Sequence, residues 1–232
     1  MLLSLPTWII HILTVSEWLV ALVLFERYGR AINSPQLRVF ALCMVPHLFA
    51  GASMLLFHVG SDQWDAVLAA ARVLTFVGSL MLLAAALWML QLRYSNKVWW
   101  LVPLVLVGGL AYAATSAEGA AALLPLTNSM YLVFLVALLF IRRADPRLFS
   151  WLTVAGFWFL LVFVIVTIFN QHLAVNVWGL PSLSHADTLH GASEAVLSVS
   201  NLMIALGVHL QLRRLRAQSS PAVTGPATAK AG

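Results

Sequence analysis

Long apolar runs separated by short polar breaks dominate this sequence. Seven runs of 18–26 residues lie near positions 5–25, 39–59, 67–92, 98–115, 120–141, 149–169 and 188–212. A helix of that length crosses about 30 Å of hydrocarbon. Lipid offers no hydrogen-bond partners to a bare backbone, so runs of this length are expected to be helical. The pattern therefore predicts an all-α polytopic membrane protein, a bundle of seven transmembrane helices.

The composition supports this class, because 62% of the 232 residues are hydrophobic and only 9% are charged. Twelve of the thirteen basic residues fall in alternate breaks or in the C-terminal segment, and Arg72 is the exception. The positive-inside rule then predicts an N-terminus outside and a C-terminus in the cytoplasm. The pI near 10 reflects topology: the basic residues are scattered over four segments, which argues against a nucleic-acid partner.

The breaks divide the chain into three predicted parts. Residues 1–97 form a three-helix membrane segment, residues 98–216 a four-helix membrane segment, and residues 217–232 a disordered tail rich in Ala, Ser, Pro and Gly. The longest break, 170–187, is expected to fold over the outer mouth of the bundle. The breaks are too short for a soluble catalytic domain, so any site must lie within the bundle or at its surface.

Titratable side chains inside the apolar runs are costly in lipid, so each is a functional candidate. Most lie in the outer half or the middle of the predicted bundle, where they would form one polar site. The predicted cofactor ligands are His11, His47 and His190. The residues predicted to orient them or balance charge are Glu17, Arg72, Glu194 and Asn201, with His58 and Asp187 at a possible rim. Catalytic residues and a metal are not assigned.

Helical spacing adds detail to this site. His190, Glu194, Ser198 and Asn201 step by four, four and three residues and form one polar stripe. Polar stripes on membrane helices face the bundle interior or water. Arg72 lies at the same predicted depth as Glu194, which makes Glu194 its expected counter-ion, with Glu17 the second choice.

Such residues support several kinds of chemistry. Two histidines at equal depth can ligate haem iron, one histidine can bind the magnesium of a chlorophyll, and histidine with carboxylates can hold iron or zinc. Plainer interpretations stand beside these. Ser198 and Asn201 can simply join helices, an Arg72–Glu194 pair can be a structural lock, and three histidines near the boundary are interpreted as interfacial, namely His58, His172 and His185.

Two resemblances follow from these residues. LPTWIIHILTVSEWLVAL with PHLFAGASMLLFH, in the first ninety or so residues, resembles the cyanobacterial and plastid family named for hypothetical chloroplast reading frame forty-nine. PLTNSMYLVFL, FWFLLVFVIVTI and DTLHGASEAVLSVSNLMIALG, in the second half, resemble a second uncharacterised family from the same organisms. The resemblances imply a photosynthetic lineage and a thylakoid or plasma membrane, and the join near Lys97 suggests a fusion of two partners.

The leading hypothesis is a non-catalytic accessory protein of the photosynthetic membrane. It would bind a pigment, haem or protein partner through the polar site and aid assembly or maintenance of a membrane complex. The first alternative is a membrane-embedded metal- or haem-dependent redox enzyme acting on a lipid-soluble substrate. The second is a small proton-coupled transporter that uses Glu17 and Glu194, which the uneven count of three plus four spans disfavours.

Overall fold

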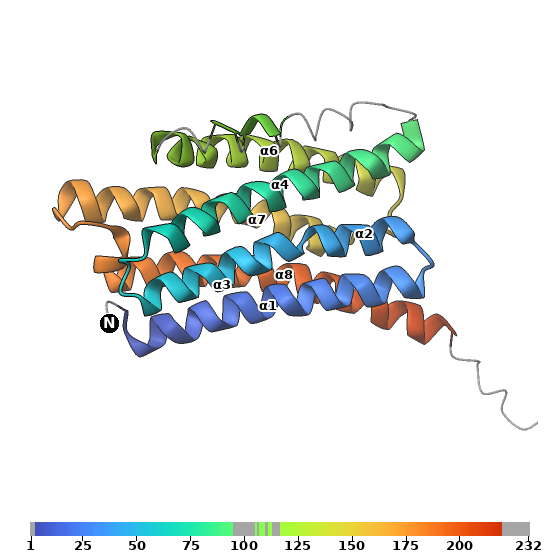
Figure 1. Ribbon diagram of the computed structural model, residues 1–232. Coiled ribbons are helices and arrows are strands. Elements are labelled where there is room, and N and C mark those ends of the chain that lie inside the picture. The colour runs from blue at the N-terminus through green and yellow to red at the C-terminus, as the bar shows by residue number, and fades with distance from the viewer. Residues whose placement is uncertain (1–2, 95–104, 106, 110, 113–116, 220–232) are drawn as a thin grey trace, which may run out of the picture.

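Helices lying side by side make up most of the described chain (Figure 1). The computed structural model describes residues 3–94, 105, 107–109, 111–112 and 117–219. The long helices are α1 (Leu5–Ala31), α2 (Pro35–Cys43), α3 (Val45–Val59), α4 (Asp65–Tyr94), α6 (Ala117–Ala144), α7 (Trp151–His172) and α8 (Asp187–Ser219). Between α7 and α8 lie a π-helical turn, η2 (Leu173–Val177), and a 3₁₀ turn, η3 (Leu183–His185). The described residues contain no strand, which confirms the all-α prediction.

Six segments of the described chain are long and apolar enough to cross a membrane. They are Leu5–Ala31, Pro35–Val59, Asp65–Leu90, Leu123–Ala144, Trp151–Val177 and Asp187–Gln218. Each coincides with one of the predicted spans, and the remaining predicted span, 98–115, lies largely outside the described residues. The protein is therefore a polytopic bundle of membrane helices.

The structure extends two helices beyond their predicted ends. The predicted loop 170–187 begins as helix, because α7 continues to His172 and passes directly into η2. Asn170 is buried there, and its side-chain amide donates to the Leu189 carbonyl at 3.1 Å and to Ser193 Oγ at 3.0 Å. At the other end α8 continues to Ser219, past the predicted start of the tail, and residues 220–232 lie outside the described chain.

The helices close into a ring. Helix α1 packs against α3, α3 against α4, α4 against α6, α6 against α7, α7 against α8, and α8 returns to α1. Figure 1 shows the first and last helices, α1 and α8, next to each other. Fully buried phenylalanines fill the centre at edge-to-face distances of 5.1–6.0 Å, namely Phe25, Phe40, Phe134, Phe149 and Phe157. In lipid such close packing, rather than escape from water, holds helices together.

The second span is broken between α2 and α3 at Met44. Pro46 lies at the start of α3, where its missing N–H removes one backbone hydrogen bond. The Trp18 indole donates to the Met44 carbonyl at 3.0 Å, and the same carbonyl also accepts the Leu48 backbone N–H at 3.3 Å, so α1 is hydrogen-bonded to the chain at the break. The break thus fixes α3 against α1 near the middle of the bundle.

Glycines allow close approach of α7 and α8. A Cβ added to Gly207 would lie 2.6 Å from the Thr153 backbone nitrogen, whereas one added to Gly108 would meet nothing within 4 Å. We expect Gly207→Ala to destabilise the fold by about 1–3 kcal/mol through overpacking, and Gly108→Ala to have no such cost. Thermal unfolding in detergent measures both. Equal melting temperatures for the two variants would show that the described α7–α8 contact does not limit stability.

Candidate metal centre at the N-terminal end of α1

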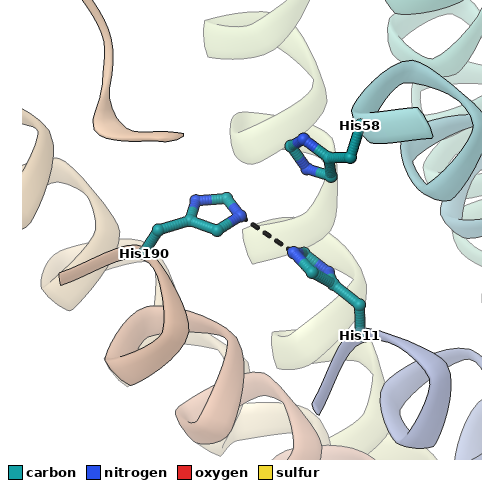
Figure 2. Close-up of side chains that lie close together, drawn as sticks. All are labelled: His11, His58 and His190. Atoms are coloured by element: carbon teal, nitrogen blue, oxygen red, sulfur yellow. Dashed lines mark hydrogen bonds between the residues drawn. The ribbon is translucent and has the colours of Figure 1, made fainter. Parts of the chain in front are cut away.

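Three buried histidines from three helices converge near the start of α1. They are His11 on α1, His58 on α3 and His190 on α8, with exposed fractions of 6%, 3% and 7%. Figure 2 shows their rings pointing toward one another. One ring nitrogen from each lies within 4.8 Å of the other two. We call these three residues the histidine trio; its members are 47 and 132 residues apart in the chain, so only the folded bundle brings them together.

The trio is nearly an equilateral triangle. Ring centroids are separated by 4.9 Å for His11–His58, 4.9 Å for His11–His190 and 5.1 Å for His58–His190. His11 Nε2 and His190 Nε2 are hydrogen-bonded at 2.8 Å. One of these two nitrogens must carry a proton and the other a lone pair, so at least one of the two rings is a neutral imidazole.

In two of the three rings, the Nδ1 atom lies close to a carboxylate. Glu194 Oε2 lies 3.4 Å from His11 Nδ1, and Asp62 Oδ1 lies 2.7 Å from His58 Nδ1. A carboxylate accepts a hydrogen bond from a nitrogen that carries a proton, so each contact favours the imidazole tautomer with its hydrogen on Nδ1. The lone pairs on Nε2 of His11 and His58 then face the centre of the trio. Carboxylate, histidine and metal are commonly arranged in this way.

Two ring nitrogens in the trio have no hydrogen-bond partner. His58 Nε2 and His190 Nδ1 are buried and unpaired. Buried polar atoms are nearly always satisfied, so each such exception calls for an explanation. A cation bound at the centre of the trio would accept the lone pair of His58 Nε2 and supply the missing partner.

A sharp turn holds His58 in position. After α3 the chain reverses through Ser61 and Asp62, whose φ angles are +53° and +62°. Aspartate tolerates this left-handed conformation better than most residues. The turn returns the Asp62 carboxylate to the preceding helical turn, where it meets His58, and the Trp8 ring lies edge-to-face against the same imidazole at 6.5 Å.

The polar stripe predicted on α8 faces α1. His190 and Glu194 are one turn apart and both reach His11. Gly191 lies between them, and an added Cβ there would approach Thr7 Oγ1 to 2.8 Å. Farther toward the end of the bundle, Asp187 accepts the Ser4 backbone N–H at 2.9 Å. The small residue at position 191 thus lets α1 come close enough for the trio to form.

The remaining predicted residues continue this contact toward the middle of the bundle. Ser198 Oγ lies 2.8–2.9 Å from both Glu17 carboxylate oxygens. The Asn201 side-chain amide donates to the Thr14 carbonyl at 3.0 Å. Glu17 and Asn201 therefore join α1 to α8, apart from the trio.

His47 and Arg72 are also not part of the histidine trio. His47 Nε2 is hydrogen-bonded to Ser79 Oγ on α4 at 3.2 Å, so it belongs to the α3–α4 contact. Among the described residues Arg72 forms no ion pair with Glu194, which faces His11 instead. The reason is the order of the ring: α4 packs against α3 and α6, whereas α8 packs against α1 and α7.

The fold and the trio define a polytopic membrane protein with a buried, carboxylate-backed histidine cluster. Residues 2–88 match a family model described as "Protein of unknown function (DUF2499)", and residues 120–213 match "Protein of unknown function (DUF3593)". The Ycf49-like protein of Synechocystis sp. (strain ATCC 27184 / PCC 6803 / Kazusa) is 33% identical over 88 residues, which cover 37% of this chain and 85% of that relative.

This chain belongs to the Ycf49-like family through its N-terminal region. The two matches confirm both resemblances seen in the sequence. No solved structure matches the chain.

Proposed function

We propose that this protein is an integral membrane accessory protein of photosynthetic membranes that holds one divalent transition-metal ion at the histidine trio. The observation that carries this proposal is the convergence of three buried imidazoles within 4.8 Å, two of them backed by carboxylates. Bound metal would lock α1, α3 and α8 together and support assembly or maintenance of a membrane complex.

The donor set indicates the class of metal. Imidazole nitrogen suits zinc, copper, iron and nickel, whereas magnesium and calcium prefer oxygen. Metal–nitrogen bonds of about 2.0–2.1 Å in tetrahedral geometry place ligand nitrogens about 3.3 Å apart. The trio spans 2.8 Å to at most 4.8 Å, so small side-chain rotations would suffice. Three protein ligands leave a fourth position for water or another small ligand.

A single ion fits the trio better than haem or chlorophyll does. Two axial histidines of a haem lie on opposite faces of the macrocycle, which separates their nitrogens by about 4 Å. His11 Nε2 and His190 Nε2 are 2.8 Å apart, which leaves no room for a macrocycle between them. The third imidazole points at the same spot, as expected for an ion rather than a planar pigment.

A binding role is favoured over turnover of a large substrate. Neither of the two described cavities borders the trio. One cavity of about 310 Å³ lies at the other end of α1, lined in part by Asn33, Gln36 and Arg147. The second candidate function, a metal-dependent redox enzyme acting on a lipid-soluble substrate, is favoured only by the open fourth position.

The orientation of the protein and the membrane in which it lies are part of the same proposal. The distribution of basic residues supports an N-terminus outside and a C-terminus in the cytoplasm or stroma, which would put the trio near the outer or lumenal surface. The cyanobacterial relative supports a thylakoid or plasma membrane as the setting, and a complex of that membrane is the partner that we propose.

Metal analysis and an absorption spectrum of one sample test the proposal. Protein purified in mild detergent from a photosynthetic host is expected to contain about one transition-metal ion per chain, without haem or chlorophyll bands. Removing the ion with a chelator and restoring it with zinc, copper or iron salts is expected to be reversible. A protein that is metal-free and binds none of these ions, or one with stoichiometric porphyrin, would overturn the proposal.

A further inference from the structure

The ring of helices consists of two consecutive halves, each matched by a different family model. We call α1 to α4 the first half and α6 to α8 the second half; the matches cover residues 2–88 and 120–213 respectively. The matched 88 residues make up 85% of the Ycf49-like relative. The remaining 15% of that relative is too short for three further membrane helices. The first half therefore occurs in a protein that has no room for the second.

The two halves meet along two seams, and the one between α1 and α8 is polar over much of its length. Its contacts join Ser4 to Asp187, His11 to His190 and Glu194, Thr14 to Asn201, and Glu17 to Ser198. Each of these contacts takes one group from each half. The other seam, between α4 and α6, completes the ring.

A polar helix face of this kind is expensive to expose to lipid. Thr7, His11 and Thr14 are buried against α8, with exposed fractions of 3%, 6% and 6%. On the other side His190 and Asn201 are buried against α1, at 7% and 3%. Each half alone would turn such groups toward hydrocarbon, where hydrogen-bond partners are absent. Each half is thus incomplete without a partner that carries the matching stripe.

We infer that this chain is a fused pair of complementary membrane subunits, and that the α1 face formed by Thr7, His11, Thr14 and Glu17 is a docking surface for a three-helix subunit built like residues 117–219. The trio lies at the junction: His11 and His58 come from the first half, and His190 comes from the second. This inference goes beyond the metal proposal, since the contacts of Ser4, Thr14 and Glu17 across the seam involve none of the proposed ligands.

Cleavage of the folded full-length chain tests this inference. A specific protease site is inserted between residues 96 and 97, and a C-terminal tag marks the second half. After cleavage in mild detergent, the first half is expected to remain bound to the tagged second half through tag capture and size-exclusion chromatography. Dilution of the cleaved sample gives the dissociation constant of the two halves.

Variants of the seam make the test specific. Ser198→Ala with Asn201→Leu removes two contacts between the halves and none of the proposed ligands. We expect the cleaved variant to dissociate roughly tenfold more readily, in line with two hydrogen bonds between membrane helices. Ser198→Ala alone is the milder variant if the double one folds poorly. Ser53→Ala is the matched control, because the Ser53 hydroxyl donates to the Phe49 carbonyl of its own helix.

The outcomes separate the two proposals. The fused-subunit inference would be overturned if the halves of the unaltered protein separate on cleavage while the uncleaved chain stays folded. An unchanged dissociation constant in both seam variants would also overturn it. Halves that stay together in protein that binds none of the offered metal ions support the fused-subunit inference and overturn the metal proposal alone. Added chelator that raises the dissociation constant of the cleaved, metal-loaded protein supports both.

Discussion

Replacing His58 with alanine is expected to abolish stoichiometric metal binding, whereas replacing His47 with alanine is expected to preserve it. His58 belongs to the trio, while His47 is hydrogen-bonded to Ser79 on α4. Loss of a ligand should weaken binding by more than the ten- to hundredfold that is typical for loss of a residue that hydrogen-bonds a ligand. Metal content of the two purified variants, before and after dialysis against a weak chelator, measures the effect.

This pair of variants is informative because sequence depth alone favours the opposite result. His47 lies near the predicted midplane and His58 near the predicted boundary. Loss of metal in the His47 variant with retention in the His58 variant would place the ligands outside the trio. His172, which is exposed at the end of α7, provides a further histidine control whose replacement should leave metal content unchanged.

The carboxylates behind the trio are expected to set its affinity. Glu194→Gln and Asp62→Asn keep nearly the same shape but remove the charge that holds hydrogen on Nδ1 of the neighbouring histidine. Each should lower metal affinity about 10- to 100-fold. Competition against a chromophoric chelator in detergent gives the dissociation constants.

Glu17→Gln is the matched control for these two variants. Glu17 is also a carboxyl group within a membrane span, but its described partner is Ser198. Its replacement should leave metal affinity within about twofold, since its described hydrogen bonds go to Ser198 and to none of the three histidines. Equal losses of affinity in all three variants would mean that general electrostatics or folding, rather than orientation of the trio, governs binding. Melting temperatures of the same samples separate these two causes.

The helices could be predicted from the sequence because lipid leaves the backbone few choices. A run such as 149–169 must satisfy its own hydrogen bonds, so it is helical wherever its neighbours lie. Helix ends depend on local partners instead. Asn170 stays within a helix because Leu189 and Ser193, far along the chain, accept its side-chain amide.

The site could be predicted only in part. The spacing of His190 and Glu194 placed both on one face of α8, and the structure turns that face toward α1. The predicted partnership of Glu194 with Arg72 is wrong because equal depth does not imply adjacency, and the ring sets α4 and α8 apart. The sequence predicts how deep a residue lies in the membrane, but the order of the helices in the bundle decides which residues at that depth are neighbours.

The position of His58 near the end of a span predicts an interfacial side chain, whereas the structure buries it. A local signal existed in the sequence: Asp62 follows four residues later, one helical turn away. The sequence does not show that these two side chains touch, because the contact depends on the turn at Ser61 and Asp62, which brings the carboxylate back to the imidazole. Side chains at the ends of spans are therefore poorly placed by counting residues from a boundary.

The sequence separation of 179 residues between His11 and His190 also sets an order of events during synthesis. A ribosome adding about 5–20 residues per second makes that stretch in about 10–35 s. Throughout this interval α1 is already made, yet the helix that completes its polar face has not been translated. A metal ion bound at the trio, as proposed, would therefore enter only after His190 has been translated, as a separate step in the life of the molecule.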